Sequence, residues 1–187
     1  MKLTSIALAA SLLPLAAHAQ LGVHEHGFGQ LNLAQSDDRL VLELFAPAAD
    51  IVGFEHNPAT GEERAAYEQA IDKGLNAAAL FALPAAAGCV LQQASHIATD
   101  EHDEHDEHDE HDEHDEHDEH EHHDDLAHSD INLRYAWLCS QPEALNGLNA
   151  AGLFMAFPGF HRIEFQGLLR SGQTAATLTA EQPEVRW

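Results

Sequence analysis

The chain contains 187 residues, of which 32 are acidic, 8 are basic and 16 are histidine, and its formal net charge is −24 at pH 7. This length corresponds to one domain of roughly 100–200 residues. The 44% hydrophobic fraction is sufficient for a core. The strong negative charge excludes a nucleic-acid binder that works by neutralising phosphates, and it argues against docking on anionic lipid.

The first 19 residues have the features of a secretory signal peptide. Lys2 provides the positive start, the segment up to Ala17 is mostly apolar, and Ala17-His18-Ala19 is a small-x-small cleavage motif. A membrane anchor is the alternative, but the apolar run is shorter than the roughly 20 residues that a spanning helix needs. We therefore expect export, removal of residues 1–19, a single domain over residues 20–187 and no membrane insertion.

The first half of this domain is predicted to form a β-hairpin and then a helix. Leucines alternate in residues 29–34 and again in residues 40–45, and residues 36–38 between them have turn chemistry. Thr60 and Glu63 have the spacing of a capping box, which predicts a helix from Thr60 to about Leu80.

Two further strands are predicted on either side of an unusual insert. Residues 89–97 enter the insert and residues 130–139 leave it, which favours antiparallel neighbours. Cys89 begins the first strand and Cys139 ends the second, so a disulfide at one end of the pair suits an exported chain. A pair of thiolate metal ligands is the alternative for these cysteines, although no Cys-x-x-Cys is present.

The end of the chain adds a short helix over residues 142–150 and a hairpin of residues 162–169 and 174–178. The predicted fold class is α+β. It has an antiparallel sheet or sheets, one main helix, one disulfide and a disordered insert rich in histidine, aspartate and glutamate.

Residues 100–128, called here the His/acid tract, contain 17 acidic residues and 10 histidines but no basic residue. Asp-Glu-His is repeated seven times from Asp100 to His120. Ordering such a segment costs about 1–2 kcal/mol per residue, with almost no apolar surface to offset it. The tract is therefore predicted to be a disordered loop in the absence of metal.

Imidazole and carboxylate groups are both ligands of Zn²⁺, and a histidine at every third position offers many overlapping sets of donors. With roughly two to four histidines per ion, the tract is predicted to hold on the order of 3–5 labile zinc ions. Binding should weaken as the pH falls, because the metal displaces protons from imidazolium. The predicted ligands in the tract are His102, His105, His108, His111, His114, His117, His120, His122, His123 and His128.

Other interpretations of the tract remain open. A solvated acidic spacer or a pH-sensing loop are two of them, although a spacer has no need of histidine at every third position. Nickel and copper(II) also bind imidazole well, so sequestration or detoxification of these metals is the main alternative function.

Three histidines outside the tract are predicted to form a structured metal site. His24 and His26 would point the same way on a strand, and His56 lies in a turn before the predicted helix. The alternative is that they are surface histidines and a turn histidine bonded to the backbone. His96 and His161 are expected to be ordinary positions.

The chain contains no catalytic motif, since it has no nucleophile elbow, no phosphate-binding loop and no His-Glu-x-x-His. We therefore expect that it is not an enzyme.

Several short motifs in order resemble the ZrgA family of zinc uptake proteins, once catalogued as a domain of unknown function. They are His24-Glu25-His26-Gly27, Gly53-Phe54-Glu55-His56-Asn57-Pro58, Cys89 before the insert, Tyr135-Ala136-Trp137-Leu138-Cys139 after it, Phe157-Pro158 and Gly172-Gln173. The resemblance implies a location in the Gram-negative periplasm, a role in zinc acquisition beside an ABC importer, and metal-binding roles for His24, His26 and His56. Its expected partner is the zinc-binding component of that importer.

Overall fold

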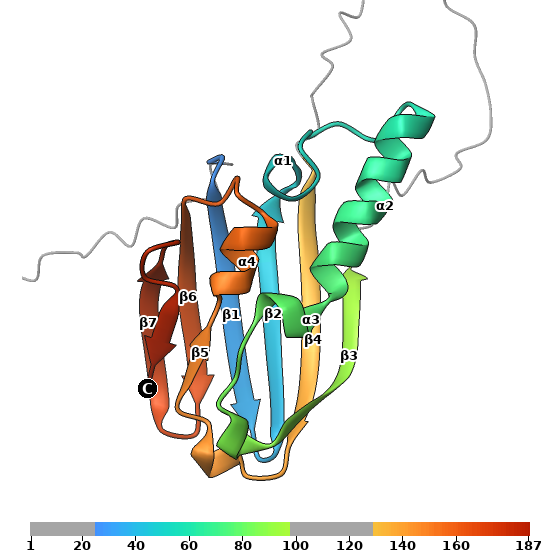
Figure 1. The fold of residues 1–187 in the computed structure, drawn as a ribbon. Helices are drawn as coiled ribbons and strands as arrows, with labels where there is room; N and C mark the ends of the chain where they lie inside the picture. The colour runs from blue at the N-terminus through green and yellow to red at the C-terminus, as the bar shows by residue number, and fades with distance from the viewer. Residues whose placement is uncertain (1–24, 98–128) are drawn as a thin grey trace, which may run out of the picture.

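The computed structural model describes residues 25–97 and 129–187, which form a six-stranded sheet, a two-stranded sheet, one helix of 15 residues and several shorter helices (Figure 1). The strand order of the large sheet is β3-β4-β2-β1-β6-β7, and β5 pairs with β8. The elements in chain order are β1 Phe28–Ser36, β2 Arg39–Pro47, α1 Ala48–Ile51, α2 Gly61–Leu75, α3 Ala77–Leu80, η1 Ala85–Ala87, β3 Cys89–Ile97, β4 Asp130–Cys139, η2 Pro142–Ala144, β5 Gly147–Asn149, α4 Ala151–Ala156, β6 Arg162–Leu169, β7 Gly172–Leu178 and β8 Glu184–Arg186.

The helices all cover one face of the six-stranded sheet, and the core lies between these two layers (Figure 1). Strand side chains alternate between faces, so every second residue of β1, β2 and β4 is buried. Leu31, Leu42 and Leu133 are fully buried, and the Tyr135 hydroxyl donates to the Gly74 carbonyl at 2.7 Å. The alternating leucines therefore predicted the buried face correctly, and the bond from Tyr135 fixes the end of α2 to the sheet.

The expected antiparallel sheet is wrong in one respect, because the sheet is mixed. The β1–β2, β2–β4, β3–β4 and β6–β7 pairs are antiparallel, as expected, but β6 lies parallel to β1. The register places Leu31 beside Phe165 and Phe28 beside Arg162. This pairing joins segments far apart in the sequence, so no local sequence pattern predicts it.

Two helix predictions need correction. The capping box at Thr60 and Glu63 is confirmed, but α2 ends at Leu75 instead of near Leu80. The chain turns at Asn76 so that α3 packs against α4, where Gly152 lies too close to the Ala79 carbonyl for any larger residue. Residues 142–150 are a short 3-10 turn followed by β5, not one helix, because β5 pairs with β8.

The β3–β4 pair has the predicted geometry, and its two ends are called here the disulfide end and the loop end. Cys89 lies opposite Cys139 and forms a disulfide with it. At the other end Ile97 lies opposite Asn132, three residues after Ser129, so both residues that flank residues 98–128 lie at this end of the pair. The His/acid tract itself falls in residues 98–128, outside the described residues. Within the described ranges, no helix combines the length and apolar character needed to cross a membrane.

Candidate metal site at the loop end

Five separate segments meet at the loop end of the sheet. Ser129, the first described residue after the tract, donates its side-chain hydroxyl to the Glu55 carbonyl at 2.7 Å and accepts from the Ala48 amide at 2.9 Å. The Gly27 carbonyl accepts from the amides of His161 and Arg162 at 2.8 and 3.0 Å. The Gly27 amide also donates to Asp50 of α1, so these bonds bring together the turn before β1, α1, the loop before α2, the start of β4 and the turn before β6.

His26 contacts a carboxylate at this end. Its Nε2 atom lies 3.4 Å from Glu55 Oε1, and the two side chains are 64% and 23% exposed. His26 belongs to a turn, because β1 begins only at Phe28. The expectation that a strand aligns His26 with His24 is therefore wrong for His26, while His24 lies outside the described residues.

Asp50 is the carboxylate that orders the turn of His26. Its Oδ2 atom accepts a hydrogen bond from the Gly27 amide at 2.8 Å. Burial raises the pKa of Asp50 above its ordinary value, while the bond from Gly27 and the nearby charges of His26 and His161 oppose that rise. Asp50, His26 and His161 are thus close enough to affect one another electrostatically.

His161 packs against the same turn. Gly27 has a φ of +79°, and a Cβ atom at this position would lie 2.9 Å from His161 Nδ1. A glycine is required here both by the backbone conformation and by the close approach of the imidazole. His161 was expected to be an ordinary position, yet it lies among potential ligands.

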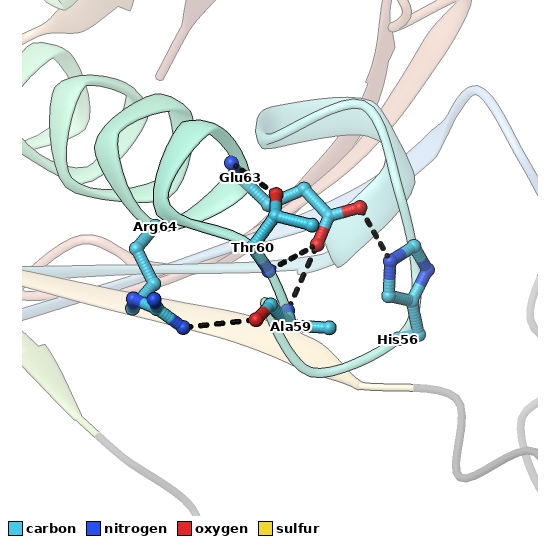
Figure 2. Close-up of polar contacts among 5 residues, drawn as sticks. All are labelled: His56, Ala59, Thr60, Glu63 and Arg64. Atoms are coloured by element: carbon cyan, nitrogen blue, oxygen red, sulfur yellow. Dashed lines mark hydrogen bonds and ion pairs between the residues drawn. The ribbon is translucent and has the colours of Figure 1, made fainter.

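His56 faces a different carboxylate, that of Glu63 (Figure 2). His56 Nε2 lies 3.2 Å from Glu63 Oε1, while Glu63 Oε2 accepts from the amides of Ala59 and Thr60 at 2.8 and 3.0 Å. These amide bonds, followed by the bond to His56, lower the pKa of Glu63 to about 2. Glu63 is therefore ionised at neutral and mildly acidic pH, and its Oε1 atom is oriented toward the imidazole.

The structure does not join the predicted histidines into one closed site. Among residues 25–97 and 129–187, no three His, Cys, Asp or Glu side chains are placed so as to hold a metal ion together. His26 and His56 each face their own carboxylate, and the prediction that they share a site with His24 stays a prediction. The ten tract histidines, from His102 to His128, lie outside the described residues.

Sequence reasoning did not select Asp50, Glu55 or Glu63 as site residues. The sequence held a signal for two of them. Glu55 directly precedes His56, and Glu63 follows His56 by seven residues in the same polar segment. Asp50 follows the apolar strand β2 and looks like a helix residue, so only the tertiary contact with Gly27 shows its position.

Two other features of the described residues do not resemble metal sites. His96 packs edge-on against Tyr67 with ring centroids 6.1 Å apart, and burial lowers its pKa. A groove of about 760 Å³ crosses the uncovered face of the sheet, where Asn32, Glu43 and Arg134 contribute to its lining. No histidine of the described residues lines that groove.

Comparison with known proteins adds the family. No curated protein matches the sequence. The family model described as "ZrgA family zinc uptake protein" matches residues 23–187, which include β1 to β8 and the loop end. The family is named for uptake of zinc, which agrees with the absence of a catalytic motif from the sequence. Because the match spans most of the chain, this protein belongs to the ZrgA family of zinc uptake proteins.

Proposed function

We propose that this protein captures zinc in the periplasm through its His/acid tract and passes the ion to the zinc-binding component of an ABC importer. The observation that carries the proposal is the placement of the tract's two attachment points. Ile97 and Ser129 lie at the loop end, beside imidazoles and carboxylates of the core. Zinc is the cargo of this system and not a resident cofactor.

The chemistry of the tract supports capture and release more than fixed binding. Seven of its ten histidines alternate with pairs of carboxylates, so one ion can exchange between overlapping donor sets. Several labile zinc ions are proposed, with His24, His26 and His56 as additional ligands. Because metal displaces protons, we expect affinity to fall on mild acidification.

The proposed location rests on two features. Residues 1–19 have the sequence of a signal peptide, and Cys89–Cys139 is a disulfide, a bond that persists in oxidising compartments such as the periplasm. The disulfide closes the chain around the tract, since its cysteines are 50 residues apart and the tract lies between them. A cross-link of this kind keeps the two halves of the core together regardless of what the tract does.

Replacing the ten tract histidines with asparagine tests the proposal while keeping the chain length and the acidic residues. We expect the zinc count, measured by native mass spectrometry, to fall by on the order of 3–5 ions. The matched control replaces ten tract carboxylates with amides and keeps every histidine, and it should lose fewer ions. An unchanged count after histidine replacement would show that the tract is not the reservoir. Competition with Ni²⁺ and Cu²⁺ in the same assay tests the alternative of nickel or copper sequestration.

A further inference from the structure

We propose that His26 and Glu55 form a two-ligand zinc site on the folded core, at the point where the His/acid tract joins it. This inference rests on the proposed function, and it names the part of the core that receives an ion from the tract. It adds Glu55 as a ligand and gives His26 a specific partner.

The spacing of the two side chains fits a shared ion. In tetrahedral coordination with metal–ligand distances of about 2.0–2.2 Å, two ligand atoms lie about 3.4 Å apart. His26 Nε2 and Glu55 Oε1 are 3.4 Å apart.

The surroundings of the pair favour a cation. Asp50 interacts electrostatically with His26, Glu55 and His161, so two carboxylates and two imidazoles surround the Gly27 turn. Asp50 is held by the Gly27 amide and His161 packs on the Gly27 backbone, which keeps both beside the pair and not in contact with a common ion. With two ligands from the core, two tetrahedral positions stay open for donors of another molecule or segment.

The backbone of Glu55 connects this pair to the tract. The Ser129 hydroxyl and amide both donate to the Glu55 carbonyl, at 2.7 and 3.4 Å. Ser129 directly follows His128, the last histidine of the tract. Glu55 therefore provides a carboxylate to the pair with His26, while its backbone is hydrogen-bonded to the residue that follows the tract.

The pair of His56 and Glu63 has a similar spacing but a different structural role. Glu63 Oε2 accepts two backbone amides at the start of α2, and the Thr60 hydroxyl accepts from the Glu63 amide. Glu63 therefore already has a structural role in the capping box, whereas the pairing of Glu55 with His26 caps no helix.

The test uses the full-length chain with the ten tract histidines replaced by asparagine, titrated with zinc alone and weighed by native mass spectrometry. We expect this tract-silenced chain to keep one zinc ion. In that background His26→Asn and Glu55→Gln should each abolish it. The control substitutions His96→Asn and Glu62→Gln, at residues outside the pair, should keep the ion. Circular dichroism of each variant verifies folding.

Three results would overturn the inference: a tract-silenced chain that binds no zinc, one that still binds it after His26→Asn, or one that still binds it after Glu55→Gln. The proposed function is judged separately, by whether silencing the tract lowers the zinc count of the unmodified chain. The inference can therefore fail while the tract is confirmed as the reservoir.

Discussion

The two ends of the six-stranded sheet differ in what their side chains do. At the disulfide end Cys89 and Cys139 cross-link the strands, and the backbone of Gly88 accepts from the Ser140 amide at 3.3 Å. Two large apolar side chains are exposed there, Val90 at 61% and Leu138 at 41%, beside charged residues such as Asp38 and Arg39. At the loop end the exposed side chains include the imidazoles of His26 and His56, each of which faces a carboxylate.

This difference separates stability from ligand chemistry along one pair of strands. A covalent bond holds β3 to β4 where nothing is expected to bind, and the polar end is left to turns held by hydrogen bonds. If the loop end binds zinc as proposed, such a division would let it rearrange around the ion without loss of the fold.

Removal of the disulfide should give the largest effect on stability. Replacing both Cys89 and Cys139 with alanine releases a loop of 50 residues in the unfolded chain, a constraint typically worth about 2–4 kcal/mol. We expect the free energy of unfolding, measured by denaturant titration, to fall by that amount while the zinc count stays unchanged. A parallel loss of zinc from the folded variant would contradict the division between the two ends.

Gly27→Ala should show how much stability the loop end contributes. The left-handed conformation of Gly27, with φ of +79°, costs an alanine about 1–2 kcal/mol, and the new Cβ would press against His161. We expect a loss of at least that size in denaturant titration. Gly53→Ala is the matched control, because Gly53 also has a positive φ but no atom lies within 4 Å of its added Cβ. Equal losses of unfolding free energy in the two variants would show that the contact with His161 does not contribute to stability.

What the sequence could predict follows from how local each feature is. The buried leucines of β1 and β2, the capping box at Thr60 and the pairing of Cys89 with Cys139 depend on patterns within or between adjacent segments. The parallel pairing of β1 with β6 and the breaks at Asn76 and residues 145–146 depend on contacts with distant segments. The candidate site divides in the same way, since His26 and His56 were selected but Asp50 was not.

Thr60→Ala should destabilise the loop end moderately by removing the acceptor for the Glu63 amide. Loss of an N-cap side chain typically costs about 1 kcal/mol. Thr60→Ser keeps the hydroxyl and should stay close to wild type in thermal unfolding. If alanine and serine behave alike, the capping box does not hold the start of α2, and the fixed orientation of Glu63 toward His56 would need another cause.

The smallest expected effect is a pH dependence of stability, which arises at the loop end and not at the disulfide end. The pKa of Glu63 is lowered to about 2 in the folded protein from an ordinary value of 4.5, so its contribution to stability is complete above 4.5 and is lost as the pH falls toward 2. Glu63→Gln keeps a side chain that can accept the amides but removes this titration. In metal-free buffer, we expect the difference in Tm between wild type and Glu63→Gln to shrink between pH 6 and pH 3. Other carboxylates titrate equally in both proteins, so parallel curves would mean that the ionised Glu63 does not stabilise the loop end. The disulfide does not titrate, and the loss of stability caused by replacing Cys89 and Cys139 should be nearly the same at both pH values.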